Sequence, residues 1–214
     1  MTMYESFRLM ARLERAKRKG SAHLLECLFS EKNLCESTKK DKGDIIEVEG
    51  IDYEILEHTK NLPSIPLVAD IVHTKAQIHP SIFHDYLGRF PRAKTPIGMV
   101  SIDSKAIEAH WLDKAKFMSQ SKLKAEIRWR KRLPRFFIQT LRNPHEIWLS
   151  YRNNEWSYVF IRKFNAEFDG VMQDIVLVAI VPVETLSVKT YYGEKENLET
   201  AEKKYRRVYL IHKR

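Results

Sequence analysis

The sequence predicts an α+β fold in which N-terminal helices pack on a curved antiparallel β-sheet of about four strands. Two observations lead to this prediction. Apolar residues recur at helical spacing up to about residue 141, and apolar or alternating runs joined by short turns follow from residue 146 onward. A series of helices followed by a series of strands is typical of α+β proteins, whereas regular alternation of the two favours a parallel sheet.

The N-terminal part combines a predicted helix with a predicted hairpin. Residues 3–19 are amphipathic, carry basic side chains in the last turns, and are followed by Gly20, which ends the helix. Residues 45–55 alternate apolar and polar side chains, as expected of a β-hairpin. Two prolines follow shortly afterwards. We therefore separate an N-terminal region of unassigned role, residues 1–65, from a second domain over residues 66–214.

Three further helices are predicted before the sheet begins. They cover residues 80–87, 103–118 and 122–141. The helical part ends at Asn143-Pro144, because a residue that precedes proline is disfavoured in a helix.

The last third of the chain predicts an antiparallel meander. Its connections are short, and Asp169-Gly170 is a typical hairpin turn. Residues 174–181 are apolar at every position after the first, which predicts a central strand covered on both faces. The four predicted strands cover residues 146–151, 156–164, 174–181 and 186–192, and residues 207–212 can add an edge strand.

Composition excludes several classes of protein. No apolar run approaches the roughly 18 residues that a membrane span requires, and residues 1–19 lack the apolar core of a signal peptide. Two cysteines, Cys27 and Cys35, are too few for a disulfide framework or a zinc finger and suggest reduced thiols. We therefore expect a cytoplasmic protein that does not associate with a membrane.

Positive charge is concentrated in one part of the chain. The net charge is +9, and residues 111–145 carry ten basic and two acidic side chains. A basic face of this kind predicts a polyanionic ligand, most commonly nucleic acid, although it is also compatible with a solvated helix surface. Trp129 lies among the cations and either stacks on bases or packs inward. The expected RNA contacts are Lys124, Arg128, Arg130 and Arg132.

Motifs for metal, nucleotide and acyl-transfer chemistry are missing from the sequence. It contains no HExxH, CxxC or Gly-x-Ser-x-Gly motif, and its seven glycines form no phosphate-binding loop. His79 and His84 are five residues apart, a spacing that helical geometry does not align for a shared ligand. We expect neither a metal site nor a cofactor.

Cleavage of RNA requires less machinery than these chemistries. RNA carries its own nucleophile, the 2′-hydroxyl group, so an enzyme needs only to move two protons and to stabilise charge on the phosphorus. Histidine is suited to the proton transfers and arginine to the phosphate oxygens. Hydroxyl groups on a strand can supply further donors.

The order of several segments resembles that of a nuclease family. Residues 141–149, 158–164, 175–181 and 188–192 are similar to the phage-borne branch of the barnase/EndoU/colicin/RelE-like (BECR) nucleases, and the resemblance extends over about residues 95–195. It implies a barnase-like RNase fold and a metal-independent endoribonuclease that leaves a 2′,3′-cyclic phosphate on tRNA or another cellular RNA. It also implies a toxin of a mobile element that is neutralised by an acidic antitoxin or immunity protein. Such a toxin acts in the cytoplasm of its own cell or is delivered into the cytoplasm of a target cell.

The resemblance also implies the site residues. His110 takes the position of the helical histidine, a general acid or base, and Arg162 takes that of the basic strand residue, a phosphate clamp. Thr190 and Tyr192 take the positions of the hydroxyl residues that contact the phosphate or the leaving group, and strand alternation places these two on one face.

Two of these assignments have an alternative one residue away. Lys163 follows Arg162, and a shift by one residue moves a side chain to the other face of a strand. Tyr191 competes with Tyr192, because many relatives have a small residue in place of Tyr191 and a proline in place of Gly193.

A second function is compatible with the same sequence. The chain can be a catalytically inactive nucleic-acid-binding accessory protein of a phage or mobile element. The presence of all four site side chains favours the enzyme.

Overall fold

The computed structural model describes residues 45–56, 62–65, 77–113 and 118–214. The chain divides into two compact units, residues 1–55 and 56–214. In the first unit, β1 (Ile45–Val48) and β2 (Ile51–Glu54) form the predicted hairpin, which turns at Glu49-Gly50 with positive φ angles of 52° and 81°. The helix predicted at residues 3–19 and both cysteines lie outside the described residues.

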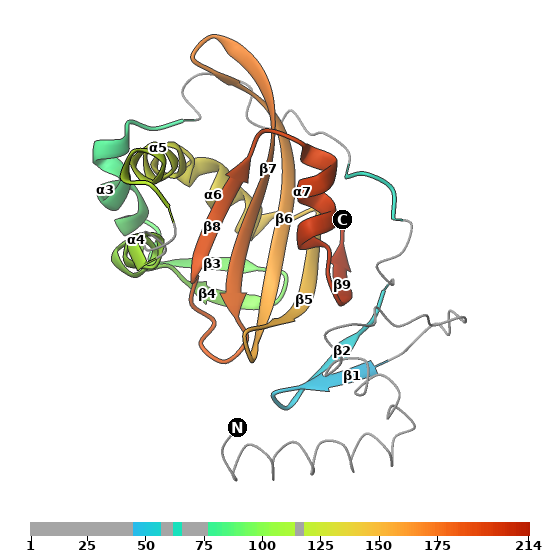
Figure 1. Cartoon of the computed structure of the whole chain (residues 1–214). Coiled ribbons are helices and arrows are strands. Elements are labelled where there is room, and N and C mark those ends of the chain that lie inside the picture. Colours follow the sequence, from blue (N-terminus) through green and yellow to red (C-terminus); the bar gives the residue numbers. More distant parts are fainter. Residues whose placement is uncertain (1–44, 57–61, 66–76, 114–117) are drawn as a thin grey trace. The chain divides into compact units, whose positions relative to one another are not determined.

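The second unit is built around a five-stranded antiparallel sheet with the strand order β8-β7-β6-β5-β9. Consecutive strands pair through short connections, so that β5 to β8 form a meander, and the last strand returns to the far side of β5 (Figure 1). The strands are β5 (Glu146–Arg152), β6 (Glu155–Phe168), β7 (Val171–Pro182), β8 (Thr190–Glu194) and β9 (Tyr209–Lys213).

Helices precede the sheet and also interrupt it. Residues 80–88 form a 3-10 turn, η2, that continues into α3, and the predicted segment 122–141 divides at Pro134 into two helices. The helices of this unit are η2 (Pro80–Ile82), α3 (Phe83–Gly88), α4 (Ser104–Asp113), α5 (Gln120–Lys131), α6 (Pro134–Arg142) and α7 (Leu198–Tyr205), and a small hairpin of β3 (Arg92–Thr95) and β4 (Gly98–Ser101) lies between α3 and α4.

The predicted fold class is wrong in two respects. The main sheet has five strands instead of about four, and the described helices do not form an N-terminal layer on it. They come from the middle of the chain, and α7 lies between the last two strands. The last strand is separated from β8 by α7 and pairs with the distant β5, so no local pattern of the sequence indicates its place in the sheet.

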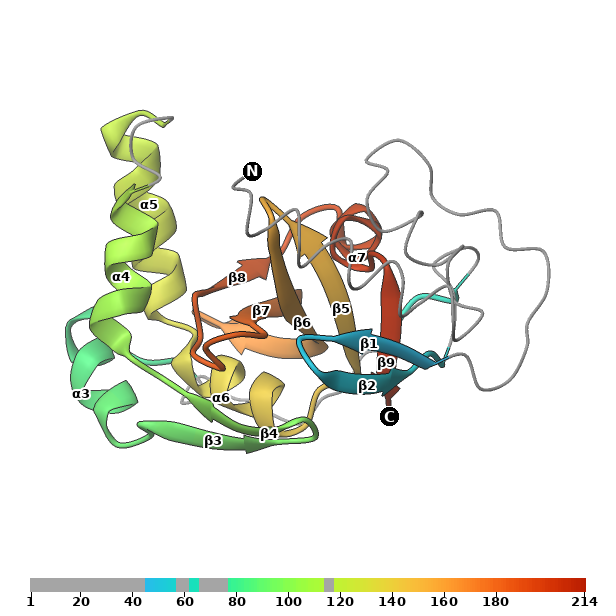
Figure 2. The same cartoon turned by 90° about the horizontal axis from the view of Figure 1, so that it is seen from below.

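Both faces of the sheet are covered. On one face, Phe136 and Phe137 of α6 pack on Phe164 and Tyr191, with ring centroids 5.1 and 4.4 Å apart. On the other face, Tyr205 of α7 stacks on Tyr192 at 6.0 Å. Figure 2 shows the sheet between these two helices. Cover on both sides explains why β6 and β7 are apolar at almost every central position.

The β6–β7 hairpin is longer than its neighbours in the sheet. Strand β5 pairs with β6 only over residues 155–161, and β8 pairs with β7 only over residues 176–180. Among the described strands, the outer part of the hairpin therefore pairs only with itself, and it projects beyond the sheet, as Figure 1 shows. It ends at the predicted Asp169-Gly170 turn, where φ is 53° and 82°.

Candidate nucleic-acid interface

Helix α5 carries the basic stretch and is fixed to its neighbours by polar contacts. Glu108 of α4 joins three helices, because its two carboxylate oxygens lie 2.5 Å from Lys131 Nζ of α5 and 2.6 Å from His84 Nε2 of α3. Burial by itself raises the pKa of Glu108, but the contacts with Lys131 and His84 outweigh it and hold the pKa below its ordinary value. The carboxylate is therefore charged near neutral pH and keeps α5 in place.

A groove of about 860 Å³ lies along this helix. Its described lining contains four Lys or Arg side chains, one carboxylate and one tryptophan, which come from four separate segments of the chain. The lining residues are Gln77, Ile78, His79, Pro80, Lys124, Ala125, Arg128, Trp129, Arg132, Asp169 and Lys195.

The sequence leaves open whether Trp129 packs inward or is available to stack on bases, and in the structure it packs inward at one edge while it also lines the groove. Its indole Nε1 donates a hydrogen bond to the backbone oxygen of Gly193 at 2.8 Å, and its ring packs on Phe168 at 5.1 Å. The side chain nevertheless stays half-buried and lines the groove, with Lys195 Nζ 5.0 Å and Arg132 Cζ 6.0 Å from the ring. The ring is thus anchored inward at one edge and surrounded by cations.

Close approach of α5 to β8 depends on Gly193. A Cβ atom at this position would collide with the Leu133 side chain, which is fully buried, and would lie 3.3 Å from Trp129 Nε1. Glycine therefore allows the end of α5 to lie against the edge strand and to hold Trp129 in its orientation.

Arg132 is already engaged at the surface of the groove. Its Nη2 lies 2.6 and 2.7 Å from the two carboxylate oxygens of Asp169, at the tip of the β6–β7 hairpin, and it also donates to Gln77 Oε1. The hydrogen bond from Arg132 lowers the pKa of Asp169, so this carboxylate remains charged. The Asp169 side chain is 70% exposed.

Three of the four expected RNA contacts line the groove, and the fourth does not. Lys124, Arg128 and Arg132 are in the lining, whereas Arg130 is only 6% exposed. Its guanidinium pairs with Glu126 and lies over the ring of Tyr192, 4.5 Å from the centroid. Helical geometry accounts for this difference, because Arg130 lies on the face of α5 that is turned towards β8.

The predicted catalytic residues do not all lie on one side of the sheet. The register pairs Arg162 with Leu177 and Leu177 with Gly193, so Arg162 lies on the α6 face. Thr190 and Tyr192 alternate with Gly193 and lie on the α7 face. Arg162 is fully buried and donates a hydrogen bond to the backbone oxygen of Asn143, where α6 leads into β5.

Helix α4, which carries His110, contacts strand β8 at Thr190. His110 is half-buried in the last turn of α4, and the next residue, Trp111, donates a hydrogen bond from Nε1 to Thr190 Oγ1 at 3.0 Å. Thr190 is itself only 1% exposed. Thr190 and Tyr192 therefore lie on one face of the edge strand β8, and the contact between α4 and this strand is made by Trp111. Arg162 lies on the opposite face of the sheet.

The two alternative residues have different surroundings. Tyr191 is completely buried, which raises the pKa of its hydroxyl, and it donates a hydrogen bond to the backbone oxygen of Arg130 at 2.8 Å. Lys163 lies on the α7 face, and its Nζ is 2.9 Å from Glu202 Oε1. Both side chains thus have structural partners.

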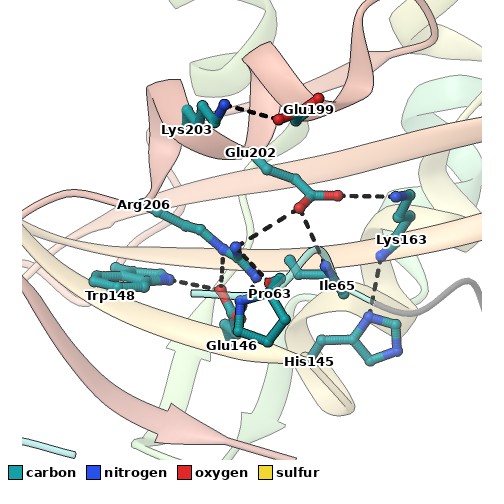
Figure 3. Close-up of polar contacts among 10 residues, drawn as sticks. All are labelled: Pro63, Ile65, His145, Glu146, Trp148, Lys163, Glu199, Glu202, Lys203 and Arg206. Atoms are coloured by element: carbon teal, nitrogen blue, oxygen red, sulfur yellow. Dashed lines mark hydrogen bonds and ion pairs between the residues drawn. The ribbon is translucent and has the colours of Figure 1, made fainter. Parts of the chain in front are cut away.

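The α7 face holds a buried network of charges that the sequence does not predict. Arg206 forms hydrogen bonds of 2.9 and 2.7 Å with the two carboxylate oxygens of Glu146, and Glu202 lies between Arg206 and Lys163 (Figure 3). Glu202 also accepts a hydrogen bond from the backbone of Ile65, and Trp148 donates one to Glu146. Because Glu146 and Lys163 are distant in the sequence from Glu202 and Arg206, no motif indicates this network.

Two other kinds of feature are absent from the described part of the chain. Among its residues, no three His, Cys, Asp or Glu side chains are grouped so that they could hold a metal ion. Within the same residues, no helix is both long and apolar enough to cross a membrane. No protein-family model, curated protein or solved structure matches the chain.

Proposed function

We propose that the protein binds RNA through the groove beside α5. The observation that carries the proposal is that four cations, Lys124, Arg128, Arg132 and Lys195, line one groove together with a half-buried tryptophan. Cations in such a groove neutralise phosphates, and an aromatic ring between them offers a surface on which a base can stack.

The same features favour a single strand over a duplex. Bases in a duplex are stacked on one another and cannot reach an aromatic side chain, whereas unpaired bases can. The anchored ring of Trp129 loses little conformational freedom when a base stacks on it, because its Nε1 is already hydrogen-bonded to Gly193.

Fluorescence anisotropy with a labelled single-stranded RNA at several salt concentrations tests the proposal. We expect the double variant Lys124→Ala with Arg128→Ala to weaken binding at least about ten-fold. The salt slope, which is the slope of the logarithm of the binding constant against the logarithm of the salt concentration, should become shallower by about 0.7 for each phosphate that the variant no longer neutralises. Both side chains are exposed, so their removal leaves the fold intact.

The matched control removes two exposed cations that do not line the groove, Lys94 and Lys203. It changes the net charge equally and is expected to retain nearly full affinity. An equal loss of RNA affinity in both double variants would show that RNA is attracted by the net charge of the protein and not bound in the groove.

Metal-independent cleavage of RNA is a second candidate function. It is supported by the hydrogen bond from Trp111, the neighbour of His110, to Thr190, and by the guanidinium of Arg130 over Tyr192. In this function His110 moves a proton and Tyr192 contacts the phosphate. Thr190 holds Trp111 in place, and Arg162 stabilises the fold from the other face. The BECR resemblance also implies a neutralising partner, an acidic antitoxin or immunity protein. The basic groove offers such a partner a surface of complementary charge.

Incubation with total RNA in EDTA, followed by analysis of fragment ends, tests this second function. We expect fragments with 2′,3′-cyclic phosphate ends, which His110→Ala abolishes while the protein keeps its thermal stability. RNA that is bound but remains intact would exclude cleavage and leave the binding function in place.

A further inference from the structure

Asp169 is the one carboxylate among the described residues that line the groove, and it is paired with one of the four cations there. Both of its oxygens lie within 2.7 Å of Arg132 Nη2. Asp169 therefore occupies a donor of the guanidinium that a phosphate oxygen would also use, because arginine recognises carboxylates and phosphates with the same N–H groups.

The segment that carries Asp169 is attached differently from the rest of the sheet. Asp169 lies at the tip of the β6–β7 hairpin, and none of the described strands pairs with the outer part of that hairpin from either side. Its side chain is 70% exposed, and Val171 and Met172 beside it are 57% and 47% exposed. An exposed ion pair is held weakly and is screened by salt, so a competing anion can replace the carboxylate.

We infer that Asp169 occupies a phosphate subsite on Arg132 and acts as an internal competitor of RNA. This inference rests on the proposed RNA-binding function and adds a regulatory residue to it. When RNA binds, a backbone phosphate takes the place of the Asp169 carboxylate on Arg132, and the remaining hydrogen bond to Gln77 keeps the guanidinium in position. The affinity of the groove is thus set below the value that its cations alone would give.

Asp169→Asn is the direct test, because it removes the charge and preserves the turn. The φ angle of Asp169 is 53°, a conformation that asparagine tolerates, and Asn-Gly is a favoured two-residue hairpin turn. We expect the single-stranded RNA affinity to increase about two- to five-fold, the range expected when an exposed ion pair is removed. The dependence of affinity on salt concentration should stay close to that of the wild type, because a phosphate binds Arg132 in both proteins and the number of neutralised phosphates is the same.

Glu184→Gln is the matched control. Glu184 is exposed and follows the opposite end of β7, and its replacement changes the net charge by the same amount. It is expected to leave both the affinity and the salt slope unchanged. Arg132→Gln, combined with Asp169→Asn, completes a double-mutant cycle in which the gain from Asp169→Asn disappears once Arg132 is absent.

The outcomes separate this inference from the function on which it rests. Wild-type binding that depends on Lys124 and Arg128, together with no gain in Asp169→Asn, would overturn the inference alone. A gain in Asp169→Asn that persists without Arg132, or that Glu184→Gln reproduces, would overturn it as well. Failure of both the wild type and Asp169→Asn to bind RNA would overturn the inference and the proposed function together.

Discussion

His145 is buried at the junction between α6 and β5, with only one of its ring nitrogens hydrogen-bonded among the described residues. Nδ1 accepts a hydrogen bond from the backbone N–H of Lys163 at 3.3 Å, whereas Nε2 is buried and has no such partner there. Burial first, and then the positive charge of Arg214, lower the pKa of His145 below its ordinary value of 6.5. The ring is therefore neutral in the folded protein near pH 7.

This lowered pKa predicts a loss of stability in mild acid. Below about pH 6.5 the unfolded chain takes up a proton that the folded protein does not, so the free energy of unfolding falls by at most about 1.4 kcal/mol per pH unit from this residue. Above about pH 6.5 both states are deprotonated at this residue, and its contribution no longer changes with pH. Urea unfolding between about pH 5 and pH 8 measures the effect.

The variant His145→Asn isolates this contribution. Its side-chain oxygen can replace Nδ1 as the acceptor for Lys163, and it removes the titratable ring. We expect a smaller pH slope below about pH 6.5, and a slope equal to that of the wild type would show that His145 is not the responsible group.

At the scale of elements, α7 is attached to the sheet mainly through its buried side. Arg206 and Glu146 are only 8% and 4% exposed, and their contact fixes the residue that follows α7 to the start of β5. On the outer side of the same helix, Lys203 and Glu199 form a pair that is 75% and 72% exposed (Figure 3). The helix thus offers a buried and an exposed ion pair for comparison.

We expect the two pairs to differ sharply in energetic importance. Arg206→Met leaves the buried carboxylates of Glu146 and Glu202 without their guanidinium partner and should lower the free energy of unfolding by about 3–5 kcal/mol. Lys203→Ala should leave it unchanged within error, because water and salt screen the exposed pair. Urea denaturation of both variants measures the difference, and a similar cost for each would contradict the assignment of α7 attachment to the buried network.

At the scale of the whole molecule, the sequence predicts features that depend on neighbours along the chain. The strands of the meander follow one another through short turns such as Asp169-Gly170, so their local pattern is sufficient to find them. The pairing of β9 with β5 depends on distant contacts. Helix α7 is only eight residues long, although Leu198, Ala201 and Tyr205 are at helical spacing. The predicted architecture lacks helix α7 and the pairing of the last strand with β5, whereas the edge strand itself is predicted at residues 207–212.

The candidate site shows the same division. The cations of α5 are visible as a charged stretch, but the groove also requires the hairpin tip with Asp169, the segment around His79, and Lys195. The positions of Arg162 and Tyr192 on opposite faces follow from the register across β7, which alternation within each strand cannot supply. The sequence thus indicates which residues are suited to bind RNA, but only the fold shows which of them lie close together.

The long β6–β7 hairpin also has a consequence for the order of folding. Its strands are adjacent in the sequence and pair continuously from the Asp169-Gly170 turn to Ser157 and Pro182, so each new pair closes only a small loop. Strand β9 must instead find β5 across most of the meander, at a much higher entropic cost. We expect the local hairpin to form early and the buried ion pairs of α7 to form later, together with the closure of the sheet by the last strand. We therefore expect the hairpin that carries Asp169 to form first and the remaining strands to assemble on it, which φ-values of about 1 for substitutions in β6 and β7 would support and values of about 0 would contradict.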